Sequence, residues 1–431
     1  MDRRSHLQLC PSHTTLSFMT SSDTTVIYVT REIERALGMA PQSNYRIVSN
    51  RTPYGEIIQK QYPEFVTLID APATKLLGTT DLLSHETTRT LLKKFSTPVI
   101  LVFKNTMRVE SAARTLNSRL LNPPAMLSER VENKLSFMRW LGPLAAKYLP
   151  PHTAKVTKLI SWRNEPFVIQ WAHGHTGDGT ILINNQDDLR AIQDRFPERM
   201  ARLSTYISGP SFTVNAIVTP ERILIGNVSY QITGLAPFTD NMFSTIGNDW
   251  ALAHRFLSND DLQSISTIVT EIGRKLQSEG WKGLFGVDVI RDDVHKRFYL
   301  IEVNARQPAS TTYESVLQTQ AREKGARGLT TFEAHLRALR GLPIDQELIE
   351  ISDGAQIVQR VTKNVQSIFE DACKNLPQSG YDVIVYQNSA PNSDLIRIQS
   401  PSGIIENHGM LNVRGREIAE TIKLAHFNIQ V

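Results

Sequence analysis

The sequence predicts a protein of the α/β and α+β class, with a parallel α/β region first, a mixed region next and a β-rich region at the C-terminus. Strand and helix patterns alternate between about residues 24 and 125, which is typical of a small parallel sheet with crossover helices. Two hairpin patterns follow, with their turns at 173–180 and 291–297. Such antiparallel pairs indicate sheets of a second kind in the same chain.

Composition and charge narrow the class of protein. The 431 residues are 41% hydrophobic and 21% charged, and the net charge of +4 comes without runs of basic residues, so we expect no nucleic-acid partner. Cys10 and Cys373 are too few for a disulfide framework or a zinc site, which favours a reducing, cytoplasmic location. No apolar run approaches the ~20 residues that span a bilayer, so no membrane association is expected. Residues 1–23, rich in Ser, Thr and His, predict a disordered tail.

The first elements are short β-branched runs separated by helical patterns. The turn after the first strand lacks the glycines of a dinucleotide fingerprint, so no Rossmann cofactor site is expected. The expected strands are Thr25–Thr30, Tyr45–Ser49, Phe65–Asp70 and Pro98–Phe103, and the expected helices are Arg31–Leu37, Glu86–Phe95 and Val109–Leu116.

The middle of the chain begins with a helix predicted over Ser128–Lys147 and continues with a hairpin. The hairpin has strands at Pro166–Ala172 and Ile181–Asn184, and its loop contains Gly174, Gly177 and Gly179. Glycines let backbone N–H groups turn toward phosphate oxygens without an intervening side chain. A flexible surface hairpin is the alternative that this pattern leaves open.

A second sheet region and several helices are predicted farther along. Apolar residues of the long helix keep helical spacing and are expected in the core: Leu262, Ile265, Ile268, Val269, Ile272 and Leu276. The expected elements are a sheet opening at Tyr206–Pro210, strands Phe212–Val218 and Arg222–Val228, a loop at Ser244–Asp249, helices Asp260–Ser278 and Phe332–Arg340, and strands Gln356–Val361 and Tyr381–Tyr386.

The second hairpin joins strands at Gly283–Ile290 and Phe298–Arg306. Side chains repeat every second residue in a strand, so Glu302 and Asn304 share one face, and folding the hairpin places Asp288 nearly opposite Glu302. Two carboxylates and an amide oxygen suit Mg²⁺. Gly283 and Gly286 would leave room for a close approach. A hairpin with solvated polar residues is the simpler alternative.

The order of a glycine-loop hairpin, a β-rich segment, a helix and an Asp…Glu-x-Asn-x-Arg hairpin resembles the ATP-grasp superfamily. The resemblance covers roughly residues 126–340, with the interlobe hinge near 204–207. It implies an ATP-grasp fold with a preceding α/β domain at 24–125 and an extra C-terminal lobe at 341–431. That lobe is similar to those of biotin-carboxylase-like and carbamoyl-phosphate-synthase-like members.

The resemblance also implies roles for individual residues. Asp288, Glu302 and Asn304 would hold two Mg²⁺ ions, or Mn²⁺ in their place, and Arg306 would be the catalytic arginine near the transferred phosphoryl group. Gln307, Ser310 and Asn248 would lie near the substrate. The implied ATP-binding residues are Lys134, Gln170, Gly174, Gly177, Gly179, Ser204, Thr205, Tyr206 and Ile207.

Two positions depart from the family pattern. The strand before the glycine loop usually ends in a lysine that contacts the phosphates, but residue 170 is a glutamine, and the hinge lacks its usual glutamate at Ser204. One positive charge beside ATP is therefore missing, which His173 or His175 would have to replace.

The function implied by the resemblance is an ATP-dependent carboxylate–amine ligase. It would activate a small-molecule acid as an acyl phosphate and couple it to an amine, and a homodimer is compatible with the family. Two alternatives stay open: an enzyme of the carboxylase or carbamoyl-phosphate type that uses bicarbonate, and a nucleotide-binding regulator without turnover.

Overall fold

The N-terminal part of the chain folds into a parallel sheet. The computed structural model describes residues 24–72, 76–172, 179–365, 375–386 and 388–427, so the predicted tail at 1–23 lies outside the described residues. The sheet has the strand order β3-β2-β1-β4-β5, with every pair parallel, which confirms the first part of the fold prediction. Its strands are β1 (Val26–Val29), β2 (Tyr45–Asn50), β3 (Val66–Ile69), β4 (Val99–Val102) and β5 (Arg119–Leu120).

Short helices surround this sheet. The segment predicted as a helix at Arg31–Leu37 forms only a 3₁₀ turn, and α1 was not predicted. A start signal for α1 is nonetheless present, because Thr52 accepts a hydrogen bond from Gly55 N and Pro53 occupies the first helical position. The elements are η1 (Ile33–Ala36), α1 (Pro53–Gln61), α2 (Thr79–Ser84), α3 (Glu86–Leu92) and α4 (Met107–Thr115).

The helix predicted over Ser128–Lys147 is in fact three short helices. Asn133 is extended and accepts hydrogen bonds from the N–H groups of Leu135 and Ser136, so it ends one helix and caps the next. Gly142, with φ of 58°, makes the second break just before Pro143. The helices are α5 (Ala125–Glu132), α6 (Lys134–Leu141) and α7 (Pro143–Tyr148).

A separate four-stranded antiparallel sheet has the order β6-β9-β7-β8. Strands β7 and β8 form the predicted hairpin, whereas β9 occupies a segment for which no strand was predicted. The glycine loop between β7 and β8, at 173–178, lies outside the described residues. The elements are β6 (His152–Val156), η2 (Thr157–Leu159), β7 (Phe167–Trp171), β8 (Thr180–Ile183), α8 (Gln186–Arg195) and β9 (Met200–Thr205).

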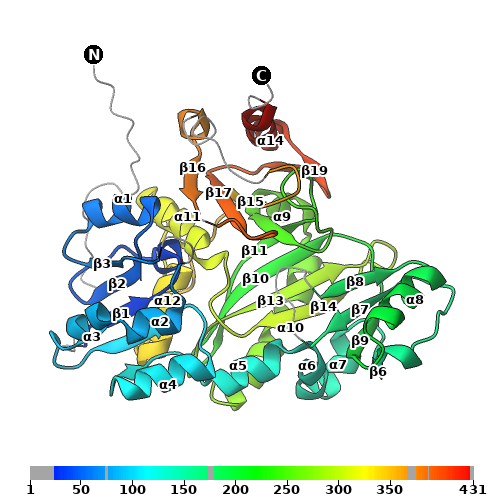
Figure 1. Ribbon diagram of the computed structural model, residues 1–431, viewed down its shortest axis with the longest axis horizontal. Helices are drawn as coiled ribbons and strands as arrows, with labels where there is room; N and C mark the ends of the chain where they lie inside the picture. The colour runs from blue at the N-terminus through cyan, green and yellow to red at the C-terminus, as the bar shows by residue number, and fades with distance from the viewer. Residues whose placement is uncertain (1–23, 73–75, 173–178, 366–374, 387, 428–431) are drawn as a thin grey trace.

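The largest sheet, the central sheet, has the strand order β14-β13-β10-β11-β12-β15-β17-β16. The strands from the C-terminal region, drawn in orange, continue this sheet (Figure 1). The segment 244–249 was expected to be a loop, but β12 occupies most of it. The strands are β10 (Ser211–Val218), β11 (Ile223–Thr233), β12 (Thr245–Asp249), β13 (Gly283–Arg291), β14 (Phe298–Asn304), β15 (Ala355–Arg360), β16 (Asp382–Val385) and β17 (Asp394–Ser400).

The two faces of the central sheet have different environments. Val214 and Ala216 of β10 pack with Ile265 and Ile272 of the long helix α10 (Asn259–Ser278) in the main hydrophobic core. Thr213 and the other alternate residues of β10 face the opposite side. The expected core residue Leu262 is 40% exposed, because it lies on the outer side of α10.

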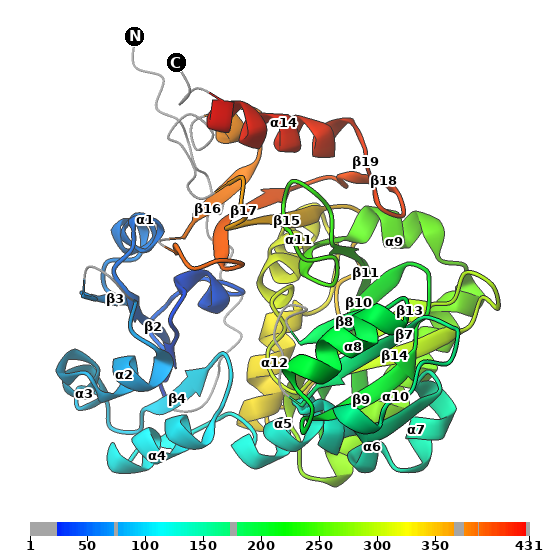
Figure 2. The same ribbon diagram turned by 45° about the vertical axis from the view of Figure 1, so that its right-hand side comes forward.

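Helix α12 (Thr331–Arg340) joins the parallel sheet to the central sheet, and it lies between them in Figure 2. Phe332 packs with Tyr28 and Tyr45 of the parallel sheet, whereas Ala338 packs with Leu284 of the central sheet. The remaining elements are α9 (Trp250–Phe256), α11 (Thr311–Glu323), β18 (Ile405–Asn407), β19 (Met410–Leu411) and α14 (Val413–Phe427).

Candidate active site

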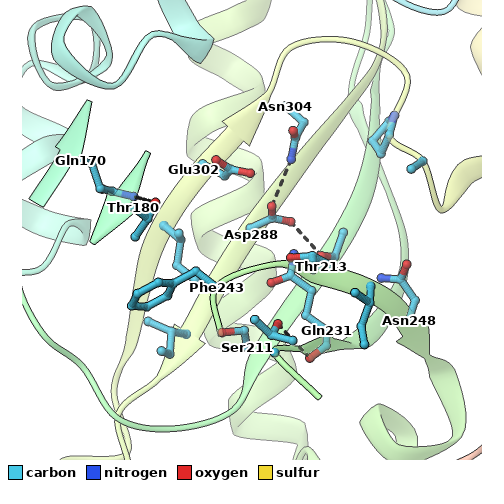
Figure 3. A pocket seen from close by; sticks show the side chains of 18 of the residues that line it. Gln170, Thr180, Ser211, Thr213, Gln231, Phe243, Asn248, Asp288, Glu302 and Asn304 are labelled. Carbon is cyan, nitrogen blue, oxygen red and sulfur yellow. Dashed lines mark hydrogen bonds between the residues drawn. The ribbon is translucent and has the colours of Figure 1, made fainter. Parts of the chain in front are cut away.

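The β13–β14 hairpin brings the three predicted metal ligands together. Asp288 pairs directly with Glu302, and Asn304 pairs with Gly286, so all three side chains lie on one face. Asn304 Nδ2 donates a hydrogen bond to Asp288 Oδ2 at 3.1 Å. Figure 3 shows Asp288, Glu302 and Asn304 converging on the same part of the cavity. Two carboxylates and one amide form an oxygen-rich set that fits Mg²⁺, which completes its shell with water and phosphate oxygens.

The two glycines of β13 have a different role from the one predicted. A Cβ at Gly286 would lie 2.7 Å from the Pro308 ring, and one at Gly283 would lie 2.5 Å from His335 Nδ1. The close approach that these glycines permit is therefore made by side chains of the same chain. Gly283 also has a φ of 79°, which favours glycine.

Lys134, at the first position of α6, forms an ion pair with Glu302. Its backbone N–H donates to Ala172 O at 3.0 Å, which fixes the start of α6 beside the end of β7. Burial and the neighbouring Glu302 charge raise the pKa of Asp288. Burial would also raise the pKa of Glu302, but the adjacent Lys134 ammonium lowers it more strongly, so the pKa of Glu302 is well below its ordinary value.

Arg306 also has a carboxylate partner. Its guanidinium pairs with Glu132, which simultaneously pairs with Lys104 at 2.6 Å. Burial would raise the pKa of Glu132, but the two cations hold that pKa below its ordinary value. One carboxylate thus holds two cations beside the trio formed by Asp288, Glu302 and Asn304, and the group of Glu132, Arg306 and Lys104 carries one net positive charge.

A cavity of about 830 Å³ contains these groups. This volume is typical of sites that bind small molecules and nucleotides. The predicted ATP-binding residues that line the cavity are Lys134, Gln170, Gly179, Ser204, Thr205, Tyr206 and Ile207. Gly174 and Gly177, like His173 and His175, lie outside the described residues.

Gln170 has a cationic neighbour that sequence analysis missed. Arg202 of β9 lies opposite Gln170 of β7, and its Nε donates to Gln170 Oε1 at 2.9 Å. Gln170 Nε2 in turn donates to Thr180 Oγ1 at 3.3 Å, as Figure 3 shows. Burial lowers the pKa of Arg202 to about 10, so the side chain is charged at neutral pH. In the sequence, the only indication of this cation was that an arginine lies two positions before the predicted hinge.

The far end of the cavity is rich in amide groups. Gln231 and Asn248 are direct cross-strand partners, and Asn248 accepts a hydrogen bond from Gln356 Nε2 at 3.2 Å. Gln356 accepts one from Arg397 Nη1 at 3.1 Å. All four side chains line the cavity. The bonds that join Asn248, Gln356 and Arg397 fix the orientations of the two amides, which suits recognition of a polar ligand.

The three residues predicted near the substrate lie in different places. Asn248 and Ser310 line the cavity, and Ser310 Oγ accepts a hydrogen bond from Asn215 Nδ2 at 3.0 Å. Gln307 is not among the lining residues. Its Oε1 accepts a hydrogen bond from Tyr28 Oη at 2.8 Å, and its Nε2 donates to Arg35 O at 2.8 Å. Gln307 therefore connects the central sheet region to the parallel sheet.

Comparisons with known proteins bear on the identity of this domain. The family model of the ATP-grasp domain matches residues 131–310, a segment that includes Lys134, Asp288, Glu302 and Arg306. No curated protein sequence matches the chain. Within the described residues, no helix combines the length and apolar character needed to cross a membrane.

Solved structures with similar folds cover nearly the whole chain. N5-carboxyaminoimidazole synthetase from Staphylococcus aureus, complexed with ADP, has a TM-score of 0.61 at 13% identity, over 93% of this chain and 96% of that one. N5-carboxyaminoimidazole synthase from Aspergillus clavatus, in complex with ADP and 5-aminoimidazole ribonucleotide, has a TM-score of 0.60 at 14% identity, over 95% of this chain and 100% of that one. L-amino acid ligase from Bacillus licheniformis has a TM-score of 0.58 at 13% identity, over 94% of this chain and 98% of that one.

These likenesses confirm the predicted fold. The match of the family model identifies residues 131–310, with the Asp288–Glu302–Asn304 hairpin inside them, as an ATP-grasp domain.

Proposed function

We propose that this protein is an ATP-dependent carboxylate–amine ligase. It would use ATP to activate a substrate carboxylate as an acyl phosphate, couple the acyl group to an amine, and release ADP and phosphate. The observation that carries the proposal is a single cavity that gathers the trio Asp288, Glu302 and Asn304 together with two cations, Lys134 and Arg306.

The nucleotide would lie between the small antiparallel sheet and the central sheet. Ser204–Ile207 line the cavity between these sheets and would present backbone groups to the adenine. Asp288, Glu302 and Asn304 would hold Mg²⁺, which neutralises charge on the phosphate oxygens when bound. Lys134, whose ammonium lies beside Glu302 in the cavity, would bind a phosphate oxygen of the nucleotide.

Arg306 would stabilise the transferred phosphoryl group. Its planar fork matches phosphate and carboxylate oxygens, and Glu132 holds it at the edge of the cavity. Positioning and electrostatics account for most of the barrier reduction in phosphoryl transfer, so no nucleophilic side chain is required. The substrate carboxylate would be the nucleophile.

The acid and the amine would occupy the end of the cavity lined by Ser310 and Asn248. The side-chain amides of Asn248 and Gln356 offer oriented donors and acceptors there, which favours a small polar acid such as an amino acid. The fold of L-amino acid ligase, at a TM-score of 0.58, supports amino acids as the first compounds to test.

The test is ADP release by the purified full-length protein with ATP and Mg²⁺. Pools of amino acids, other carboxylic acids and bicarbonate are added separately, each with and without amines, and products are identified by mass spectrometry. Release that requires both an organic acid and an amine, with an amide product, is the expected result.

Two other outcomes would contradict the proposal. Release that depends on bicarbonate alone would identify an enzyme of the carboxylase or carbamoyl-phosphate type. Tight ATP binding without release in any pool would identify a nucleotide-binding regulator. The variant Glu302→Gln serves as the inactive reference, because it removes one charge from the proposed metal site while keeping the side-chain shape.

A further inference from the structure

Arg202 is a buried cation without a matching anion. It is 4% exposed and lies on β9, directly opposite Gln170 of β7, which is 7% exposed. No carboxylate among the described residues forms an ion pair with Arg202, although arginines elsewhere in the cavity wall, Arg306 and Arg360, each have one.

The hydrogen bonds of Arg202 leave part of its guanidinium unused. Nε and Nη2 both donate to Gln170 Oε1, and Nη2 lies 3.5 Å from Ile301 O. Nη1 is buried and has no hydrogen-bond partner within the part of the chain that the structure describes. A buried charge without an anionic partner is costly, so its presence points to a ligand that supplies the anion.

The surroundings of Arg202 identify the chemistry of that ligand. Arg202 lines the same cavity as Lys134 and Glu302 and precedes the hinge residue Ser204 by two positions on β9. The charge of Glu302 acts on Arg202 and raises its pKa, but Glu302 already forms an ion pair with Lys134. An anion bound between these groups would lie where the phosphates of the nucleotide are expected.

We propose that Arg202 binds phosphate oxygens of the nucleotide and supplies the positive charge that is absent at position 170. Gln170 then acts as a positioning residue, because its Oε1 accepts two guanidinium N–H groups and orients the remaining ones toward the cavity. This assignment rests on the proposed function, since it requires that the cavity bind a nucleotide.

The pairing of β7 with β9 explains how a cation from another strand can serve this position. Cross-strand partners have Cβ atoms about 5 Å apart, and an arginine side chain spans that distance easily. A charge lost from β7 can therefore be replaced from β9 without a change in the fold. A purely structural role would instead be limited to the hydrogen bonds with Gln170.

The experiment measures binding of ATP, ADP and adenosine to the full-length protein by calorimetry in the presence of Mg²⁺. Arg202→Gln should weaken ATP and ADP binding by about tenfold or more and leave adenosine binding unchanged, because only the phosphates lose a partner. Arg202→Lys should lose less affinity for ATP and ADP than Arg202→Gln, since the positive charge remains. The double variant Arg202→Gln/Gln170→Lys should regain ATP affinity, because a cation returns at the paired position.

Arg190→Gln is the matched control, because Arg190 belongs to the same lobe, pairs with Asp187 on the surface and does not line the cavity. Thermal melting checks that each variant is folded. ATP affinity within about twofold of wild type in a folded Arg202→Gln variant would overturn the assignment. An equal weakening of adenosine binding would also overturn the assignment, because it would indicate a structural role for Arg202.

The wild-type measurement separates the two levels of inference. If the unaltered protein binds neither ATP nor ADP, the proposed function and the role of Arg202 fail together. If it binds both and the Arg202 variants bind them equally well, only the assignment of Arg202 fails.

Discussion

Lys134 and Glu302 form an ion pair that connects two separate parts of the ATP-grasp domain. The ammonium comes from the first turn of α6, and the carboxylate comes from β14 of the central sheet, 168 positions later. The break at Asn133 places Lys134 at a helix start, where its side chain reaches Glu302 of the proposed metal-binding trio. The ion pair therefore joins α6 to the central sheet inside the cavity.

Replacing Lys134 should impair ATP binding more than folding. We expect Lys134→Ala to raise the KM for ATP by about tenfold or more, because a cation beside the phosphates is lost. Steady-state kinetics at varied ATP measure this change. Lys147→Ala is the control, since Lys147 is exposed and pairs with Glu271 outside the cavity. An unchanged KM in Lys134→Ala would remove Lys134 from the nucleotide site.

Glu302 should be required for turnover. We expect Glu302→Gln to lower kcat by roughly 100-fold or more, because a neutral amide neither binds a divalent cation strongly nor balances Lys134. Circular dichroism should show a native fold. Glu198→Gln, on the surface, is the comparison. Full activity in Glu302→Gln would contradict the metal assignment.

The hydrogen bond between Tyr28 and Gln307 should stabilise the contact between the parallel sheet and the ATP-grasp domain. Both residues are buried, so Tyr28→Phe leaves Gln307 Oε1 without this donor and should lower the free energy of unfolding by about 1–3 kcal/mol. Urea denaturation measures the change, with Tyr299→Phe as the control.

The same pair distinguishes a structural from a substrate-binding role for Gln307. If Gln307 is structural, then Gln307→Ala and Tyr28→Phe should both lower stability and leave the KM for the acid unchanged, with the larger loss of stability in Gln307→Ala, which also removes the bond to Arg35 O. A rise in that KM in Gln307→Ala alone would instead support the substrate contact that the sequence suggested.

His335 should make the fold sensitive to acid. Complete burial lowers its pKa from 6.5 to about 3, and its Nδ1 accepts the Leu284 N–H at 3.0 Å, which requires the neutral ring. The unfolded chain takes up this proton below pH 6.5 while the folded chain does not, so stability falls as pH falls through that window. Acidification from pH 7 to pH 5 should lower the free energy of unfolding by about 2 kcal/mol through this residue.

Urea denaturation of wild type and His335→Gln at both pH values isolates this contribution. The glutamine variant should lose less stability on acidification than wild type, because it cannot take up the proton. An identical pH dependence of the two proteins would show that His335 is not the acid-sensitive group.

Much of the fold could be predicted because local patterns express it. The β-branched runs of the parallel sheet and the alternation on both sides of 291–297 gave strands within one or two residues. One of the segments that were missed has a composition typical of loops. Strand β12 contains Gly247, Asn248 and Asp249, which favour loops, yet it pairs on both sides, and a Cβ at Gly247 would lie 2.1 Å from Gln356 O.

The candidate site likewise contains one part that local sequence patterns predict and another that depends on the tertiary structure. The sequence by itself determined that Asp288, Glu302 and Asn304 share a face, because the two-residue period of a strand and the short turn of a hairpin leave little freedom. Only the tertiary structure decided that Arg202 lies beside Gln170, that Lys134 reaches Glu302 and that Gln307 bonds to Tyr28. Those contacts join segments 32 to 279 positions apart. They depend on strand order and helix packing, which no local pattern of residues specifies.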